Sequence, residues 1–371
     1  MHVALNLAFL VPGEMGGLDL YARRLSQALA ERDDVHLTML LSRPAAGDRS
    51  WRELGRVVKL TTDPRRRTEW VLADQLHVPV AAARTGADVV HSLASTGPIS
   101  APVPSVVTIH DLNYLRYPQA HFGLRALGMR ILVPAAARRA KRVIVSSEAT
   151  RSDVVRHLGL PADAVDVVPL GLGHPPMEPG RSREEVRAEF KAGDRSLLLT
   201  VSAKRAHKNL VRLLGAVALL APERRPILVM PGYPTPHEAE LRACADELGI
   251  SGNIRLLGWV SDGQLEDLYR AADAFVFPSL HEGFGLPVLE AMARGLPVAT
   301  SGRTSLAEVA GDAALLFDAE DEASIAKAVE RVLFDRDLAA RLTAAGPRQA
   351  ARFTWEATAA GVLASYRRAL A

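Results

Sequence analysis

Short apolar runs alternate with amphipathic stretches along nearly the whole chain. The apolar runs are about four to seven residues long, the length of a buried β-strand. Between them, residues 18–31 and 147–158 show helical spacing, and Ser147 followed by Glu148 is typical of an N-cap with an acidic first turn. This alternation predicts an α/β protein with parallel sheets. The strands predicted in the first half are residues 3–8, 36–41, 88–92, 105–110, 142–147 and 165–169.

The segment GLGHPPMEPG, residues 171–180, interrupts this pattern. Three prolines and three glycines in ten residues disfavour regular structure, so we interpret the segment as a linker. A second alternating series follows it. We therefore expect two doubly wound α/β domains that face each other across a cleft, with ligands bound at the carboxyl ends of the strands. The strands predicted in the second series are residues 197–203, 226–230, 253–258, 274–279, 297–300 and 313–317.

Length and composition agree with a two-domain globular protein. The chain has 371 residues, of which 48% are hydrophobic and 23% charged. Its single cysteine, Cys244, excludes an intramolecular disulfide. The apolar start of the chain has no basic segment or small-residue cleavage site, which favours a first buried strand over a signal peptide. Since no apolar run is long enough to span a bilayer, we expect a cytoplasmic location.

The charge is mildly positive and unevenly distributed. Residues 1–170 hold 21 Lys and Arg against 16 Asp and Glu, in a chain whose net charge is +3. This basic half favours an acidic acceptor or peripheral contact with an anionic membrane. The basic runs at residues 65–67 and 138–142 are otherwise interpreted as solvated charge. Aromatic residues make up 5% of the chain and do not interleave with a dense basic patch, so we do not expect a nucleic-acid partner.

The run HEGFGLPVLE, residues 281–290, carries the strongest chemical signal. It follows the apolar run AFVF, contains a glycine-rich turn, and places Pro287 in the first turn of a predicted helix. A helix N-terminus after a strand directs free N–H groups and a positive dipole towards one point, where an anion can bind. Glu282 stands at that point, and Glu290 lies about one turn into the helix. A ligand with a central phosphate and hydroxyls at both ends, such as a nucleotide sugar, would use both carboxylates.

Cations are concentrated in the segment AKRAHKN, residues 203–209. Lys208 precedes a predicted helix, where its charge opposes the helix dipole, so a bound anion explains it better than helix stability does. Lys204 and Arg205 could contact the same diphosphate. The alternative is a solvated basic loop.

Two further candidates follow strands of the first half. The loop PGEMGG, residues 12–17, has paired glycines that permit close approach of backbone to phosphate, although an ordinary glycine turn explains it equally well. His110, followed by Asp111, ends a predicted strand and could contact a sugar hydroxyl or a phosphate. A single histidine is more often structural.

No convincing metal-ligand spacing is present. Asp335 and Asp337 form a DxD triplet, which binds metal in one class of sugar transferases, but here it begins an amphipathic helix and is better interpreted as a cap. We expect neither a metal nor a cofactor.

Together these segments resemble the retaining glycosyltransferases of family 4, which have the two-domain GT-B architecture. The similarity covers nearly the whole chain and is closest to a mannosyltransferase-like subgroup. The segments that carry it are GGLDLYARRL (16–25), TIHDLNYLRYP (108–118), VIVSSEATRSDVVRHLG (143–159), VVPLG (167–171), HKNLVRLLGA (207–216), residues 253–298 and RTSLAEVAGDAALLF (303–317). The resemblance implies an acceptor-side domain over residues 1–170 and a nucleotide-sugar-binding domain over residues 181–353. We expect residues 354–371 to form a helix that packs back on the first domain.

The resemblance also implies catalytic and sugar-contacting residues. Gly16 and Gly17 would lie beside the donor diphosphate. His110 would contact the transferred sugar near the reacting centre, and Lys208 would bind the diphosphate. Glu282 would contact the sugar, either as a nucleophile or as electrostatic support; both alternatives stay open.

Further donor contacts are implied in the second domain. The backbone of Phe284, Gly285 and Leu286 would contact the sugar and phosphate. Glu290 would bind the ribose hydroxyls, and Val260 would lie beside the base.

One segment departs from the family pattern. The family places glycine and then arginine or threonine after the first strand of the second domain, whereas this chain has Ser202 and Ala203. The basic residue that helps Lys208 must then be Lys204 or Arg205, or be absent.

The sequence thus predicts metal-independent, retaining transfer of a hexosyl unit from a GDP- or UDP-linked sugar to an acceptor hydroxyl. The acceptor, whether glycan, lipid-linked or small molecule, is not identified. The alternatives are a nucleotide-sugar-binding protein that has lost catalysis and a nucleotide-sugar epimerase of the same architecture.

Overall fold

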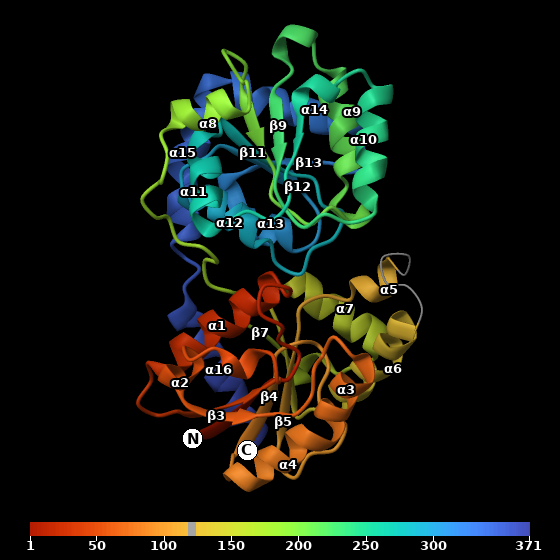
Figure 1. Ribbon diagram of the computed structural model, residues 1–371, viewed down its shortest axis with the longest axis vertical. Coiled ribbons are helices and arrows are strands. Elements are labelled where there is room, and N and C mark those ends of the chain that lie inside the picture. The colour runs from red at the N-terminus through yellow and green to blue at the C-terminus, as the bar shows by residue number, and fades with distance from the viewer. Residues whose placement is uncertain (118–123) are drawn as a thin grey trace. The chain divides into compact units, whose positions relative to one another are not determined.

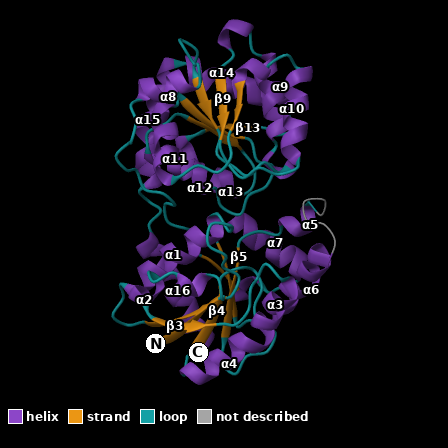
Figure 2. Ribbon diagram, in the orientation of Figure 1, coloured by secondary structure: helices purple, strands orange, loops and turns teal. Residues whose placement is uncertain are grey.

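The computed structural model describes residues 1–117 and 124–371. Pro118, the last residue of the motif TIHDLNYLRYP, lies outside the described residues. The chain divides into two compact units, each containing one parallel sheet with helices packed around it (Figures 1 and 2). Unit 1 contains Met1–Gly171 and Thr354–Ala371, and unit 2 contains Leu172–Phe353. The predicted α/β class with two doubly wound sheets is confirmed.

The sheet of unit 1 has the order β3-β2-β1-β4-β5-β6-β7. Its strands are β1 (His2–Leu7), β2 (His36–Leu41), β3 (Arg56–Lys59), β4 (Val89–Ser92), β5 (Ser105–Ile109), β6 (Arg142–Val145) and β7 (Val165–Val167). The six predicted strands are confirmed. Strand β3 was not predicted, because its four residues RVVK begin and end with an exposed basic side chain and offer little apolar signal.

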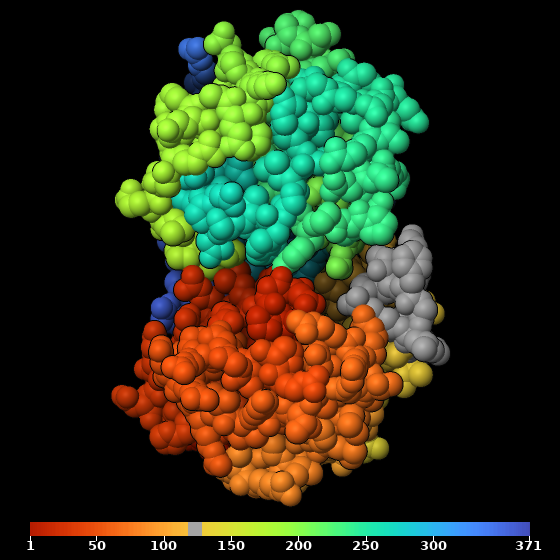
Figure 3. Space-filling view, viewed as in Figure 1, coloured from red at the N-terminus to blue at the C-terminus, as the bar shows by residue number. Residues whose placement is uncertain are grey.

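Helices cover this sheet, and one of them comes from the far end of the chain. The helices of unit 1 are α1 (Gly17–Ala30), α2 (Trp51–Leu54), α3 (Arg67–Leu72), α4 (Val78–Thr85), α5 (Asn113–Arg116), α6 (Leu124–Arg139), α7 (Glu148–Leu158) and α16 (Trp355–Leu370). Ser147 caps α7, as predicted, by accepting a hydrogen bond from the N–H of Thr150. Helix α16 packs on α1 and on β4, β5 and β6. Blue C-terminal atoms are visible beside red N-terminal ones in Figure 3.

The sheet of unit 2 has the order β10-β9-β8-β11-β12-β13. Its strands are β8 (Leu197–Leu199), β9 (Ile227–Met230), β10 (Ile254–Leu256), β11 (Ala274–Phe277), β12 (Val298–Ser301) and β13 (Leu315–Phe317). Its helices are α8 (Arg183–Glu189), α9 (Leu210–Leu219), α10 (His237–Glu247), α11 (Asp262–Ala271), α12 (Leu286–Ala293), α13 (Ser305–Ala310), α14 (Glu322–Phe334) and α15 (Arg336–Ala350). All six strands predicted in this half are confirmed.

The core of unit 2 forms where α9 and α14 cover the central strands. Leu213 and Val329, from these helices, belong to one buried apolar cluster with Leu198 of β8 and Val276 of β11. Residues 171–180, all of them described, carry no helix or strand, as their proline and glycine content predicts.

Candidate functional site

The strand order of unit 2 brings its two predicted anion-binding segments together. Strand β8 lies between β9 and β11, so the strand order changes direction at the β8–β11 pair. In open α/β sheets, ligands bind at the carboxyl ends of the strands at such a point. Residues 200–209 follow β8 and residues 278–285 follow β11, so both segments begin at this edge of the sheet.

Hydrogen bonds fix these two segments to each other. The N–H of Leu280 donates to the carbonyl of His207 at 2.9 Å. The amide nitrogen of Asn209 donates to the carbonyls of Pro278 and Ala319, at 3.1 and 2.7 Å. Asn209 also has a left-handed backbone with φ of 59°, a conformation that asparagine tolerates well. The residue before it, Lys208, is therefore held in a defined place.

Lys208 and Glu282, both predicted to be catalytic, form an ion pair. The ammonium Nζ of Lys208 lies 2.6 Å from Oε1 of Glu282, and the two side chains are 17% and 14% exposed. The same ammonium lies 5.5 Å from the centroid of the Phe277 ring. The site thus pairs a cation with a carboxylate, both largely shielded from solvent.

The carboxyl group of Glu282 is ionised at neutral pH. Burial raises the pKa of Glu282, but the charges of Lys208 and His207, together with the hydrogen bond from Lys208, hold that pKa below its ordinary value. The backbone is also fixed: its N–H donates to Oγ1 of Thr304 at 3.3 Å, and its carbonyl accepts from Oγ of Ser305 at 2.9 Å. Glu282 can therefore stabilise positive charge or attack as a nucleophile, but it is a poor proton donor.

Helix α12 begins beside Glu282 without a side-chain cap. Its N-cap is Gly285, with φ of 119°, and Pro287 occupies the first turn, as predicted. A Cβ on Gly285 would lie 2.6 Å from a methyl group of Leu306, so only glycine fits. The Phe284 side chain is buried and packs on Phe353 at a ring-centroid distance of 5.7 Å, which leaves the backbone of residues 284–286 for a ligand.

The two basic residues next to the β8 strand end have different surroundings. The Lys204 side chain is fully buried, and its ammonium donates to the carbonyls of Gly232, at 2.8 Å, and Leu257. Its Nζ also lies 3.7 Å from Glu238. The Arg205 side chain is exposed and, in the described part of the chain, makes no hydrogen bond or ion pair. Lys204 thus joins the loops that follow β9 and β10, whereas Arg205 is available to a ligand.

Glu290 lies on α12 and is buried among polar partners. Its Oε1 accepts hydrogen bonds from the backbone N–H and the imidazole Nδ1 of His174, at 3.1 and 2.8 Å. Its Oε2 accepts from the Tyr269 hydroxyl at 3.0 Å. Sequence reasoning singled out neither partner: His174 lies in the proline-rich linker, and Tyr269 lies within an amphipathic helix.

A stacked aromatic pair, half-buried Tyr233 and exposed Trp259, lies next to Val260, the residue expected beside the base. The rings of Tyr233 and Trp259 stack at a centroid distance of 4.5 Å, and Trp259 is 60% exposed. Tyr233 follows β9 and Trp259 follows β10, so both residues lie at the same edge of the sheet as the Lys208–Glu282 pair. Val260 itself is partly buried.

In unit 1, the predicted glycine loop follows strand β1. Gly16 is the N-cap of α1 and has φ of 52°, which favours glycine. Gly17 is the first helical residue, and a Cβ on it would meet no atom within 4 Å. The backbone at Gly17 is therefore open to a ligand.

His110, directly after β5, is held as a neutral imidazole. Its Nε2 lies 2.8 Å from the carbonyl of Leu93 and must carry a proton, because a carbonyl can only accept. Burial lowers the pKa of His110, although the Leu93 contact and the charge of Asp111 act in the opposite direction. Its Nδ1 is then unprotonated and can accept a hydrogen bond from a sugar hydroxyl.

A buried polar chain supports His110. The edge of the Tyr21 ring meets the imidazole at a centroid distance of 4.7 Å, and the Tyr21 hydroxyl lies 3.1 Å from Oγ1 of Thr108. Thr108 also contacts His91 at 2.8 Å, and His91 contacts the Tyr366 hydroxyl of α16 at 2.6 Å. Sequence reasoning missed this chain. The sequence signal that could have revealed it is the spacing of Thr108 and His110, because side chains two residues apart lie on the same face of a strand.

The remaining polar motifs have local structural roles. Asp335 caps α15 by accepting a hydrogen bond from the N–H of Leu338, as predicted for the DxD triplet. In the basic runs, Arg66 pairs with Glu69, and Arg142 with Asp166. Among the described residues, no cluster of three or more His, Cys, Asp or Glu side chains is placed to hold a metal. No described helix has the length and hydrophobicity that crossing a membrane requires.

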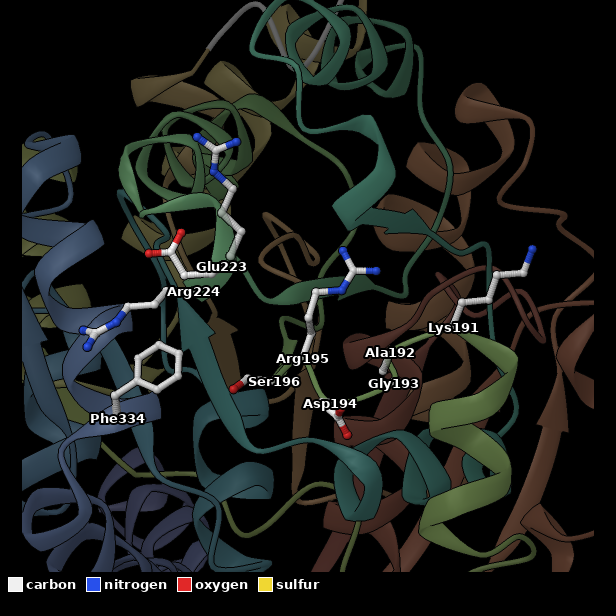
Figure 4. Close-up of a pocket in the computed structure, with 10 residues that line it drawn as sticks. Lys191, Ala192, Gly193, Asp194, Arg195, Ser196, Glu223, Arg224 and Phe334 are labelled. Carbon is white, nitrogen blue, oxygen red and sulfur yellow. The ribbon is translucent and has the colours of Figure 1, made fainter.

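A surface depression of about 370 Å³ lies at the opposite edge of unit 2 (Figure 4). It is lined by residues 191–196, which precede β8, and by residues that precede β9, so it adjoins the amino ends of these strands. Arg224 packs on Phe334 and pairs with Glu330. The depression is separate from the residues predicted to bind the donor.

Two family models and a characterised relative match this chain. The family described as "Glycosyltransferase Family 4" matches residues 15–173, and "Glycosyl transferases group 1" matches residues 182–349. The O-antigen chain mannosyltransferase B of Escherichia coli is 33% identical over 267 residues, which cover 71% of this chain and 70% of that protein.

Solved structures share the fold over almost the full length. Sucrose-phosphate synthase from Thermosynechococcus elongatus has a TM-score of 0.78 at 23% identity, over 99% of this chain and 98% of that one. HepE from Anabaena, solved in complex with UDP and glucose, has a TM-score of 0.76 at 19% identity, over 98% and 100%. The fold is therefore GT-B, and the chain belongs to glycosyltransferase family 4.

Proposed function

We propose that this glycosyltransferase transfers a hexosyl unit from a nucleoside-diphosphate sugar to an acceptor hydroxyl, with retention of configuration and without a metal. The Lys208–Glu282 pair beside the uncapped start of α12 carries the proposal. It combines positive charge for a diphosphate with a carboxylate for a sugar, at the sheet edge where α/β proteins bind ligands.

Charge on the departing diphosphate is the main electrostatic demand of this reaction. Preorganised donors meet that demand best, because they need no rearrangement as the charge develops. We assign this role to Lys208, to the N–H groups at the start of α12 and to Arg205. Lys204 is a weaker candidate than Arg205, because its ammonium is already bound to two carbonyls.

Positive charge developing on the sugar is the second demand. The ionised Glu282 carboxylate would stabilise an oxocarbenium-like state, and the departing phosphate oxygen would accept the proton of the acceptor hydroxyl on the same face. Retention then requires no enzymic nucleophile. In the alternative mechanism, Glu282 attacks the anomeric carbon and forms a covalent glycosyl-enzyme, which the acceptor then displaces.

The remaining contacts follow the family pattern. We propose that His110 accepts a hydrogen bond from a hydroxyl of the transferred sugar and that Gly16 and Gly17 approach the diphosphate. In unit 2, Glu290 would bind ribose and Val260 the base.

The proposed domain roles follow the same pattern. Residues 1–170 would form the acceptor side, 171–180 the linker and 181–353 the donor side, with 354–371 completing the first domain. We propose a cytoplasmic enzyme, in peripheral contact with the membrane if its acceptor is lipid-linked.

The donor is best identified before the acceptor. The Escherichia coli relative is a mannosyltransferase, and HepE was solved with UDP and glucose, so GDP-mannose and UDP-glucose are the first donors to test. Native mass spectrometry of the purified protein should detect binding, and slow hydrolysis should release the nucleoside diphosphate.

Stereochemistry and metal dependence test the finer proposal. With an acceptor, NMR should show a product with the anomeric configuration of the donor, at a rate that EDTA does not change. An inverted anomer or a chelator-sensitive rate would refute the mechanism. Binding of the donor without any turnover would instead indicate a sugar-binding protein.

A further inference from the structure

The carboxylate proposed to bind ribose is already occupied by the protein itself. Oε1 of Glu290 accepts two hydrogen bonds from one residue, His174: the backbone N–H at 3.1 Å and the imidazole Nδ1 at 2.8 Å. Oε2 accepts one, from Tyr269 at 3.0 Å. The Glu290 side chain is only 4% exposed, so its carboxylate is largely shielded from solvent.

These hydrogen bonds leave Glu290 little capacity to accept further hydrogen bonds from a ligand. An ionised carboxylate has about four lone-pair positions, two on each oxygen. His174 fills both positions on Oε1, and Tyr269 fills one on Oε2. Within the described part of the chain, one position is left, on Oε2. A ribose diol needs two acceptor positions to bind through both of its hydroxyls.

The imidazole of His174 can leave without releasing the segment around it. Arg294 donates to the carbonyls of His174 and Pro175, at 3.1 and 3.3 Å, and is itself held by the buried Glu266. These contacts anchor the backbone, not the ring. The His174 side chain is 28% exposed, with Nε2 3.6 Å from Oδ1 of Asp262, so part of the ring faces solvent.

We propose that His174 is a specificity-determining residue of the donor site, whose imidazole competes with the ribose hydroxyls for Glu290. This inference rests on the proposed function, in which Glu290 binds ribose. With the imidazole in place, Glu290 can accept one ribose hydroxyl. Without it, one position is open on each oxygen, and the carboxylate can accept both. His174 thereby limits how strongly the site distinguishes a ribose from a sugar that lacks those hydroxyls.

Calorimetric titration with matched nucleotides tests the proposal. The probes are GDP, UDP and their 2′,3′-dideoxy counterparts, and the measured quantity is the ratio of dideoxy to ribo Kd. In His174→Ala the ratio should rise by about tenfold over wild type, because a second hydrogen bond to a charged acceptor becomes available. His174→Asn, which keeps an amide donor near the place of Nδ1, should keep the wild-type ratio. Glu290→Gln should bring the ratio close to one.

Other outcomes would overturn the proposal in distinguishable ways. An unchanged or smaller ratio in His174→Ala means that the imidazole positions Glu290 and does not compete with ribose. If that variant does not fold, His174→Leu, which keeps side-chain bulk but has no donor, is measured in its place. An unchanged ratio in Glu290→Gln removes Glu290 from the ribose site. If wild type binds neither GDP nor UDP, the proposed function itself fails.

Discussion

At the scale of single residues, the pairing of Lys208 with Glu282 decides what each can do. In the structure each neutralises the other in a largely buried position. A diphosphate that arrives beside Lys208 would compete with Glu282 for the ammonium. Its binding would then leave the carboxylate free to face the developing charge on the sugar, without any change in its protonation.

Replacing Glu282 by glutamine tests this role. Glu282→Gln should lower kcat by about 10²-fold or more, because a neutral amide cannot stabilise the oxocarbenium-like sugar. Donor affinity should change much less. Steady-state kinetics with varied donor separates the two effects. Glu320→Gln is the matched control, since that carboxylate is 56% exposed and pairs only with Arg303 in the described structure. A Glu282→Gln enzyme with full kcat would contradict the assignment.

His91 offers a test of stability against pH. Burial lowers the pKa of His91 to about 3, whereas an unfolded histidine has a pKa of 6.5. The unfolded chain therefore binds a proton below pH 6.5 that the folded chain does not, so stability is lost as the pH falls from 6.5 towards 3.

The expected change in unfolding free energy follows from the linkage between proton binding and folding. Between pH 6.5 and 5, the unfolding free energy of wild type should fall by about 2 kcal/mol more than that of His91→Gln. Urea unfolding at several pH values in this range measures the difference. Parallel pH profiles for the two proteins would show that His91 is not held neutral.

At the scale of elements, strand positions were more predictable than side-chain contacts. Twelve strands followed from local apolar runs, because burial on both faces of a parallel sheet leaves a continuous signal. The contact between His174 and Glu290 could not be predicted in this way, since it joins residues 116 positions apart. The burial of Lys204 depends on carbonyls of two other loops, which no local pattern around residue 204 reveals.

The start of α12 depends both on a local sequence pattern and on a long-range contact. Sequence predicted the helix and its first-turn proline, but the reason for Gly285 is a long-range contact with Leu306. Gly285→Ala should therefore lower the unfolding free energy by about 1–3 kcal/mol, through its positive φ and the clash.

Denaturant unfolding of paired variants checks this prediction. Gly252→Ala, at an ordinary backbone conformation with open space around its Cβ, should change stability by less than about 0.5 kcal/mol. Combining Gly285→Ala with Leu306→Ala removes the clash but not the strained φ, so it does not restore stability. Wild-type stability in Gly285→Ala would contradict the steric argument.

At the scale of the whole molecule, unit 1 is built from two segments that are far apart in the sequence. Residues 354–371 belong with the first 171 residues, although all of unit 2 lies between them in sequence. Helix α16 contributes the buried side chains of Val362, Leu363 and Tyr366, and the Tyr366 hydroxyl contacts His91.

Removing α16 should weaken unit 1 selectively. A chain ending at residue 353 should show amide hydrogen exchange at least about 100-fold faster in β4, β5 and β6, because several kcal/mol of apolar burial are lost there. Strands β8 to β13 should keep their protection. Leu370→Ala in the full-length chain is the control, since that side chain is 44% exposed. Equal acceleration in both units would contradict this division.

The position of α16 also constrains the order in which the protein can form during synthesis. When the last residue of unit 2 has been translated, the helix that completes unit 1 has not yet been made. All residues of unit 2 are thus translated before those of unit 1 are complete. Unit 1, although its first 171 residues are translated first, must wait with the α16-facing side of β4, β5 and β6 uncovered until α16 has been made. The segment Met1–Gly171 is therefore the part of the nascent chain that needs protection by chaperones for the longest time.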